Sequence, residues 1–431
     1  MARHLKRAAL AATAALAVGG VTTDVRGAGF ALIEQGASGV GNAYAGAAAV
    51  AEDASTVFFN PAGMARLDRA QVVLAGHVLN VDTKFQNNGS TVPGGFPTGG
   101  NGGQAGDVVL VPNLYAVIPL NDRMRFGVSL TSPFGLATEY GDGWVGRFQA
   151  LKSEVKTLSL NPSLSYKVND QVAVGVGFSV TTLDATIRRN QLLQLPGPVL
   201  NQGTAQFGGS DTAFSFNVGV LFSPAEDTRL GLAYRSKTEL GLEGSMSVNT
   251  STGVPIAAAT GPITADLTLP ASLSASLYQG LTDRWALLAD ITFTTWSDIQ
   301  SLVVRPGGAN VGSSTQLDLH FRDTYRFSVG ANYQLNDAWK LRFGVAWDQS
   351  PVTSSQERTA NLPDNNRTWL AVGFRWQATK TGVVDFGYAH LFVRDTPIDH
   401  TAFPNQAQSG RIVGEYKNSI DIFSAQYTHM F

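Results

Sequence analysis

Residues 172–180 read Val-Ala-Val-Gly-Val-Gly-Phe-Ser-Val, so that every second side chain is bulky and apolar and those between are small. A period of two residues is typical of a strand that presents one face to an apolar environment. The same alternation recurs at 325–333, 341–348 and 369–376. We therefore expect many half-buried strands, as found in both β-sandwiches and β-barrels.

The connections between the strands favour a barrel. Short polar turns, such as 168–170 and 335–337, alternate with long segments rich in Gly, Pro and Asn, such as 84–106, 190–210 and 395–415. This alternation is typical of an up-and-down outer-membrane barrel with tight periplasmic turns and long external loops. The pattern predicts an all-β fold, a 14-stranded antiparallel transmembrane β-barrel. Its strands are expected at 70–83, 107–118, 123–136, 155–168, 171–189, 211–223, 228–246, 263–281, 285–304, 322–335, 339–352, 367–378, 382–394 and 416–431.

The composition agrees with a membrane protein and excludes several function classes. The 431 residues carry a net charge of −2, no cysteine and only 15% charged residues, against about a quarter in soluble domains. Near-neutral charge excludes a nucleic-acid partner, which would need a basic face. Without cysteine there is no thiolate site, and the six histidines lack the spacing of metal ligands. We expect no metal, no cofactor and no enzymatic activity.

The N-terminal residues indicate export. Arg3, Lys6 and Arg7 precede an uncharged, mostly apolar stretch, Ala8–Val18, which is shorter than the ~20 residues that span a bilayer as a helix. This is the pattern of a signal peptide rather than of an anchor. We predict a signal peptide over residues 1–27 and a location in the outer membrane of a Gram-negative bacterium.

Residues 28–69 do not alternate and are rich in Gly and Ala. Asn60-Pro61 predicts a helix start, with Asn60 as the cap and Pro61 at the first helical position, followed by Ala62. A second helix is expected within 42–50. A segment before the first strand could be a periplasmic extension or a plug in the lumen. Its small side chains favour a hatch over residues 28–69 that plugs the lumen of a barrel formed by 70–431.

The hatch segment also carries a resemblance. The motifs Gly29-Phe30-Ala31-Leu32, Gly39-Val40-Gly41-Asn42 and Asn60-Pro61-Ala62-Gly63 resemble those of the long-chain fatty acid outer-membrane transporter family, and the similarity extends along the mature chain. The resemblance implies a monomeric, hatch-plugged barrel that takes up hydrophobic molecules without using energy, surrounded by lipopolysaccharide and outer-membrane lipid. Long-chain fatty acids are the first expectation. Aromatic hydrocarbons, or a structural or adhesin barrel without transport, remain alternatives.

Candidate ligand contacts follow from the resemblance and from strand parity. The resemblance makes Phe30 a candidate gate and places an apolar and a basic ligand contact at Ile187 and Arg189. The external loops are apolar enough to collect a hydrophobic ligand, although these side chains could simply pack the loops together, and Arg189 could be a solvated loop residue. The loop candidates are Phe134, Trp144, Leu192 and Leu193.

Two further expectations concern the wall and the lumen. The resemblance implies a kink in the third strand that opens a lateral exit, and Pro133 and Gly135 interrupt this strand; alternatively, they simply end it. The inward cations Arg326, Arg342 and Arg375 are expected to form ion pairs with Glu52, Asp53 or Asp348.

Overall fold

The computed structural model describes residues 29–194, 200–307, 314–402 and 404–431. The predicted signal peptide therefore lies outside the described residues. One sheet of twenty strands forms the wall. The strands are β1 Gln71–Asn87, β2 Val108–Pro119, β3 Met124–Thr131, β4 Gly135–Glu139, β5 Lys152–Lys167, β6 Val172–Gln194, β7 Leu200–Ala225, β8 Thr228–Arg235, β9 Thr238–Thr250, β10 Gly261–Leu269, β11 Ser272–Gly280, β12 Trp285–Thr294, β13 Ser301–Pro306, β14 Thr315–Asp318, β15 Thr324–Asn336, β16 Trp339–Asp348, β17 Arg367–Gln377, β18 Gly382–Val393, β19 Thr396–His400 and β20 Ile412–Met430.

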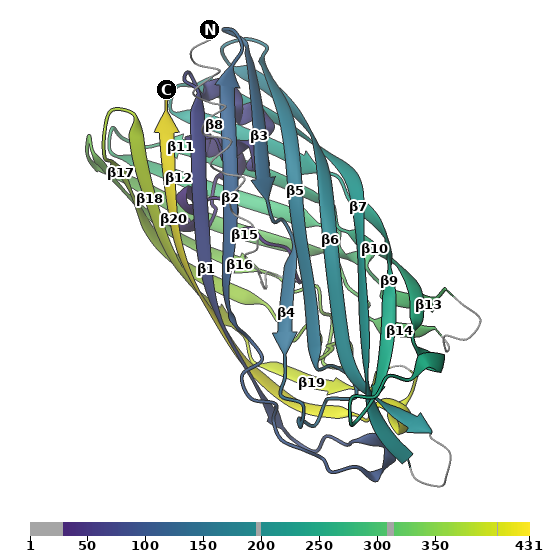
Figure 1. Ribbon diagram of the computed structural model, residues 1–431. Helices are drawn as coiled ribbons and strands as arrows, with labels where there is room; N and C mark the ends of the chain where they lie inside the picture. The colour runs from purple at the N-terminus through teal and green to yellow at the C-terminus, as the bar shows by residue number, and fades with distance from the viewer. Residues whose placement is uncertain (1–28, 195–199, 308–313, 403) are drawn as a thin grey trace.

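These strands make fourteen passes through the wall, because six passes are each built from two consecutive strands: β3 with β4, β8 with β9, β10 with β11, β12 with β13, β14 with β15, and β18 with β19. All neighbours are antiparallel, and β1 pairs with β2 on one side and with β20 on the other. The sheet is therefore closed, as Figure 1 shows. The predicted 14-stranded antiparallel barrel is confirmed.

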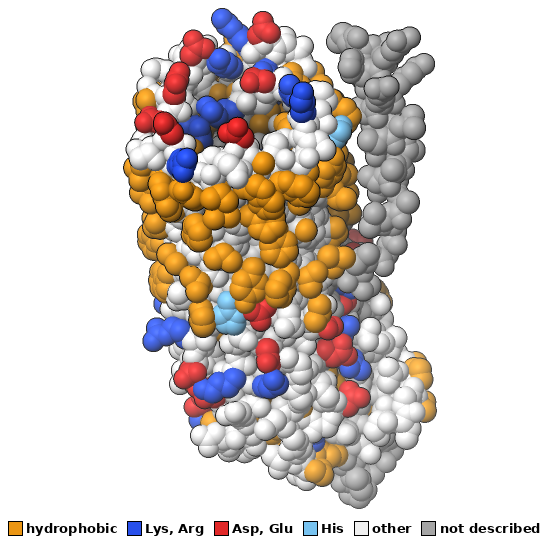
Figure 2. Space-filling model, turned by 90° about the vertical axis from the view of Figure 1, so that its left-hand side faces the viewer, with side chains coloured by type: hydrophobic (Ala, Val, Ile, Leu, Met, Phe, Trp, Pro, Cys, Tyr) orange, Lys and Arg blue, Asp and Glu red, His pale blue; other side chains and the backbone are white. Residues whose placement is uncertain are grey.

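The bulky apolar side chains of the alternating strands lie on the outward face of the barrel. Val174, Val176 and Phe178 are exposed, whereas Ala173 and Ser179, on the other face of the same strand, are buried. Figure 2 shows that, on the face in view, such side chains form a band across the barrel, with charged side chains above and below it. A band of this kind, bounded by charges, is the surface that hydrocarbon requires.

The hatch, defined here as residues 29–69, occupies the lumen at the end where the C-terminus lies, in purple in Figure 1. It consists of short helices joined by turns: α2 Ala37–Val40, α3 Ala47–Val50, α4 Thr56–Phe59 and the 3₁₀ helix η1 Pro61–Arg66. The external loops add η2 Pro93–Gly95, η3 Ala257–Ala259 and α5 Gln406–Ser409, and η4 Trp296–Asp298 interrupts the wall. No helix in the described part of the chain is long and apolar enough to cross a membrane.

The helix start at Asn60 is confirmed. The Asn60 side chain accepts a hydrogen bond from the backbone N–H of Ala62, and Pro61 is the first residue of η1. The helix expected within 42–50 is wrong in its first half, because Ala43 and Tyr44 have positive φ angles. The Asn42 amide donates to the wall carbonyls of Ala331 and Phe343, both at 3.2 Å, and these bonds hold the chain against the wall.

Inward-facing glycines seat the hatch. A Cβ atom added to Gly344 would overlap the backbone of Asn42, and one added to Gly387 would lie 2.6 Å from Val40 Cβ. Glycines of other strands meet the hatch in the same way: Gly127, Gly175, Gly219, Gly231 and Gly330. The small residues of the alternation therefore let the hatch backbone approach the wall closely.

Two expectations about strand boundaries are wrong. The segment 190–210 is mostly a hairpin rather than a loop, because the β6–β7 ladder continues to the pair Gln194↔Leu200. The passes expected at 228–246, 263–281 and 285–304 are each broken. At one break Pro270 has no N–H to donate to the ladder, and at another the chain turns through η4. These breaks bring residues of the wall into the lumen.

The seating of the hatch predicts the effect of one substitution. Gly344→Val is expected to destabilise the folded protein by ~1–3 kcal/mol through overpacking and to raise the ion conductance of the barrel, because the hatch no longer fits. Thermal unfolding in detergent and conductance in planar bilayers measure the two effects. Gly241→Val is the matched control, because a Cβ atom there meets nothing within 4 Å. Equal behaviour of both variants would contradict the seating.

Candidate functional site

Phe30 lies in an aromatic clamp formed with the two wall residues Phe134 and Trp296. The ring centroid of Phe30 lies 4.9 Å from that of Trp296, edge-on, and 5.9 Å from that of Phe134. Trp296 also packs against Phe321 at 5.9 Å. Phe30 is only 6% and Trp296 only 1% exposed. The clamp joins the start of the hatch to two breaks of the wall, one between β3 and β4 and one at η4.

The first break is the interruption of the third pass. β3 ends at Thr131 and β4 starts at Gly135, and both pair with β5, so the pass continues beyond Pro133. The alternative that Pro133 and Gly135 simply end the strand is therefore wrong. On the other side, the β2–β3 ladder reaches only Leu114↔Leu130, and within the described wall β4 has no partner in β2. The wall is incomplete between β2 and β4.

The hatch supplies hydrogen bonds at this break. The backbone N–H of Leu32 donates to the carbonyl of Pro133 at 2.9 Å, and the N–H of Gly135 donates to the carbonyl of Phe30 at 2.8 Å. The Gln35 side chain donates to the carbonyl of Ser132 at 2.8 Å. The first hatch residues thus act as a short strand that covers the break from inside.

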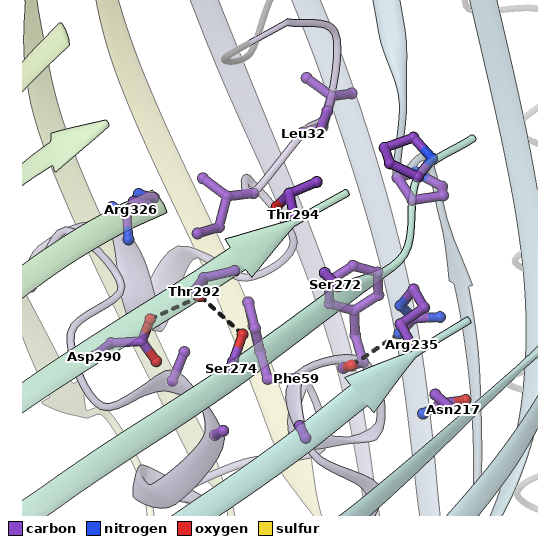
Figure 3. A pocket seen from close by; sticks show the side chains of 18 of the residues that line it. Leu32, Phe59, Asn217, Arg235, Ser272, Ser274, Asp290, Thr292, Thr294 and Arg326 are labelled. Atoms are coloured by element: carbon purple, nitrogen blue, oxygen red, sulfur yellow. Dashed lines mark hydrogen bonds between the residues drawn. The ribbon is translucent and has the colours of Figure 1, made fainter. Parts of the chain in front are cut away.

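A cavity of about 160 Å³ lies between this part of the hatch and the wall. Leu32, Phe134 and Trp296 give it an apolar side. Its opposite side is polar, and Figure 3 shows Arg235, Asn217, Ser274, Asp290, Thr292 and Arg326 around it. Such a cavity can hold a molecule with an apolar body and a polar group.

Ile187, one of the predicted contacts on β6, lines a second apolar space nearer the external end. Ile187 and Phe207 line a small pocket of about 30 Å³. Leu193 is buried in the same large apolar cluster as Phe30 and Phe207. Arg189 donates to the Thr315 hydroxyl at 2.7 Å, and its guanidinium lies 6.0 Å from the Phe207 ring centroid. Among the described residues, no carboxylate forms a salt bridge with Arg189.

Two predicted ligand contacts lie elsewhere. Leu192 faces away from Leu193, and a Cβ atom on Gly94 would lie 3.1 Å from its side chain. Trp144 is fully buried in a separate cluster of the external loops, stacked on Tyr140 at 3.8 Å, and it donates to the Ala150 carbonyl. Leu192 and Trp144 are therefore not brought together with the clamp, and Trp144 packs the loops.

Residues that the sequence analysis did not single out hold the start of the hatch. The N–H of Gly29 donates to Asp364 Oδ2 at 3.1 Å, and Arg367 and Ser350 hold that carboxylate in turn. Gly29 has a φ of 61°, and a Cβ atom there would lie 2.6 Å from Trp296 Cζ2. Trp296 lies within the strand predicted over 285–304, so nothing in its local sequence identifies it as a site residue.

An ionic cluster anchors the hatch further along the chain, at Glu52. Glu52 bonds Lys340 at 2.7 Å, Arg375 at 2.8 Å and Arg342 at 3.1 Å. Arg342 also pairs with Asp385 at 2.5 Å. The expected pairing of Arg342 and Arg375 with Glu52 is confirmed. Arg326 differs, because it donates to the Ala43 carbonyl at 2.7 Å rather than forming a carboxylate pair among the described residues.

Comparison with known proteins identifies the family to which this barrel belongs. The profile of the family described as outer membrane protein transport protein (OMPP1/FadL/TodX) matches residues 18–431. The chain belongs to this family. It is 30% identical to the long-chain fatty acid transport protein of Escherichia coli K12 over 430 residues, covering 91% of this chain and 94% of that one. It is 31% identical to outer membrane protein P1 of Haemophilus influenzae, covering 90% of each. The protein is an outer-membrane protein.

Solved structures of the transport family share the fold. A crystal structure of a Pseudomonas aeruginosa FadL homologue aligns with a TM-score of 0.85 at 27% identity, covering 93% of this chain and 99% of that one. The Ralstonia pickettii toluene transporter TbuX aligns with a TM-score of 0.69 at 20% identity, covering 93% and 100%. Within the described residues, no group of three or more His, Asp or Glu side chains could hold a metal ion.

Two carboxylates of the hatch, Glu52 and Glu34, have pKa values shifted in opposite directions. Burial alone would raise the pKa of Glu52, but Lys340, Arg375 and Arg342 hold it well below its ordinary value. Burial raises the pKa of Glu34 to about 7 against the weaker pull of Arg367 and Arg326. Glu52 is therefore ionised at neutral pH, whereas Glu34 gains charge only as the pH rises through about 7.

The ionic cluster predicts an acid-sensitive hatch. Because the pKa of Glu52 is lowered in the folded state, its contribution is present above its unfolded pKa and is lost as the pH falls through the folded pKa. Glu52→Gln leaves three cations without this partner and is expected to destabilise the protein by ~3–5 kcal/mol. Denaturant unfolding as a function of pH measures both effects. Glu226→Gln, on an exposed turn, is the control; equal stability and equal pH profiles would contradict the anchor.

The clamp predicts that Trp296 restrains the start of the hatch. In an Ala31→Cys background, which carries the only thiol of the chain, Trp296→Ala is expected to increase the rate of labelling by a water-soluble thiol reagent. The reason is that Phe30 loses its edge-on partner and the large-to-small change opens a cavity. Trp285→Ala, on the outward face, is the control. Unchanged labelling would show that Trp296 does not restrain the hatch.

Proposed function

We propose that this protein takes up long-chain fatty acids passively across the outer membrane. The observation that carries the proposal is Arg189, an inward cation that donates to the Thr315 hydroxyl and whose guanidinium lies 6.0 Å from the ring of Phe207, which lines the apolar pocket. A cation beside an apolar surface matches a molecule with a carboxylate head and a hydrocarbon tail. The long-chain fatty acid transport protein of Escherichia coli, 30% identical, supports the same substrate class.

The proposed path runs from Arg189 through the apolar cluster to the clamp. Ile187, Leu193 and Phe30 belong to or pack against one continuous cluster, so a hydrocarbon tail can remain out of water along it. Each buried methylene contributes about 0.8 kcal/mol. Displacement of Phe30 from Trp296 would connect this cluster with the cavity of about 160 Å³, since Trp296 and Phe134 border both.

We propose that the cargo leaves sideways at Pro133 and Gly135. The wall is incomplete between β2 and β4 at this level, and Pro133 and Phe134 line the cavity. The hatch residues that cover the break are held by single hydrogen bonds rather than by a long ladder. Cargo released there would enter the bilayer without crossing the periplasmic turns. In this proposal the protein works as a monomer among lipopolysaccharide and membrane lipid, and it catalyses no reaction.

Aromatic hydrocarbons are the second candidate cargo. The clamp residues Phe30, Phe134 and Trp296 present ring edges and faces at 4.9–6.3 Å, a spacing that also suits an aromatic guest. TbuX, described as a toluene transporter, shares the fold at 20% identity. An aromatic hydrocarbon has no carboxylate, so its uptake would not need Arg189.

Uptake into proteoliposomes tests the proposal and separates the two cargoes. Arg189→Ala is expected to weaken oleate binding about tenfold to a hundredfold, the range for losing a charged hydrogen bond of ~1.5–3 kcal/mol. Arg189→Lys keeps the charge and should retain part of the affinity, and toluene uptake should be the same in all three proteins. Oleate uptake no faster than in empty liposomes would favour a structural or adhesin barrel; toluene uptake alone would favour the second cargo.

A further inference from the structure

The wall is also incomplete between β7 and the pass of β8 and β9, where β7 lies three passes along the sheet from β3. The β7–β8 ladder ends at the pair Asn217↔Arg235, and the β7–β9 ladder begins at Ser210↔Glu243. In this fully described stretch, six residues of β7 face seven residues of the neighbouring pass without register partners. We call this stretch, residues 211–216 against 236–242, the β7 seam.

Side chains partly replace the missing ladder at the two ends of the seam. At one end the N–H of Ser236 donates to the Phe216 carbonyl at 2.9 Å, and the Ser236 hydroxyl accepts from the Phe216 N–H at 3.0 Å. At the other end the N–H of Gly241 donates to Asp211 Oδ2 at 2.7 Å. Few hydrogen bonds therefore have to break for the two edges to separate.

The wall is hollow on both sides just beyond the Asn217–Arg235 end of the seam, where the β7–β8 ladder is intact. Val218 and Tyr234 line the inner cavity of about 160 Å³ together with Asn217 and Arg235. The same Val218 and Tyr234 line a groove of about 460 Å³ on the outward, bilayer-facing surface. One layer of wall residues therefore separates the cavity from the hydrocarbon of the membrane.

Aromatic side chains frame the seam on the outside. Phe214 is 77% exposed, more than any other large apolar side chain of the described wall. The ring of Phe216 packs on that of Tyr234 at 5.9 Å, directly over the shared wall position. These rings give the β7 edge of the seam an apolar outer surface, whereas the facing edge carries the exposed ion pair Lys237–Glu239 at 2.6 Å.

We propose that the β7 seam is a second lateral passage, through which hydrophobic cargo moves between the inner cavity and the bilayer. The cavity touches the wall at the β3 break, through Pro133 and Phe134, and at the last ladder pairs next to the seam, Asn217↔Arg235 and Val218↔Tyr234. The passage rests on the proposed uptake function and gives it a second route. Its cargo is a nonpolar chain or ring, because the outer groove is lined almost wholly by Val, Leu and Tyr.

Cysteine pairs test the passage cleanly, because the natural chain has no cysteine. Phe216→Cys with Ser236→Cys locks the seam, and Ala31→Cys with Phe134→Cys locks the hatch over the β3 break. Val329→Cys with Val345→Cys, register partners on an intact outward ladder, is the matched control. Oleate uptake into proteoliposomes is measured after oxidation and again after reduction of each full-length variant.

Oxidation of the seam pair is expected to cause a partial, reducible loss of uptake, and the control pair no loss. Combining the seam and hatch pairs should remove the remaining uptake. A seam pair that behaves as the control pair would overturn the second passage.

A second measurement keeps the passage testable if oleate is not carried at all. A fatty acid with a photoreactive group in its tail, supplied in the bilayer, should label both the outward Phe214 and the inward Asn217 before locking. After locking, labelling of Asn217 should fall while labelling of Phe214 persists. Labelling confined to Phe214 in both states would show a surface groove without a passage, whatever the outcome for uptake.

Discussion

Hydrocarbon offers no partner for a backbone N–H or carbonyl group, and the remainder of this structure depends on that constraint. A sheet that closes on itself satisfies the requirement, because each strand bonds a neighbour on both sides. Here β1 bonds both β2 and β20, so the wall has no free edge. Departures from the ladder are therefore informative, since each one leaves polar backbone to be satisfied by something else.

The two departures are satisfied in different ways. Between β2 and β4 the backbone of the hatch itself takes over, through the bonds of Phe30 and Leu32 to the broken pass. Along the β7 seam the wall uses its own side chains, Ser236 and Asp211. The cavity borders the first region at Pro133 and Phe134 and reaches the ladder pair next to the second, Asn217 and Arg235. The interior of the barrel is thus least isolated from the membrane at the level where a hydrophobic guest would be held.

The faces of the strands could be predicted from the sequence, because the bilayer imposes the alternation directly. Phe178 and Val345 point outward as their spacing indicates. Strand ends were harder to predict, because beyond the bilayer nothing enforces the alternation, and the β6–β7 ladder continues through a segment that reads as a loop.

Within the candidate site, residues that are adjacent in sequence point to opposite faces of the wall. Leu192 and Leu193 are adjacent, yet strand parity sends only Leu193 into the cluster around Phe30. Trp296 could not be identified because its importance comes from Phe30 and Gly29, which lie far away along the chain. The pairing of Glu52 with Arg342 and Arg375 was predictable, since buried charges require partners.

The glycine seats link assembly of the protein to closure of its wall. The hatch rests on Gly127 near the start of the barrel and on Gly387 near its end. Those two seats reach their final separation only when the first and last strands have met. Docking of the hatch on both seats therefore requires the closed wall, and a wall that closed without the hatch would lack these contacts.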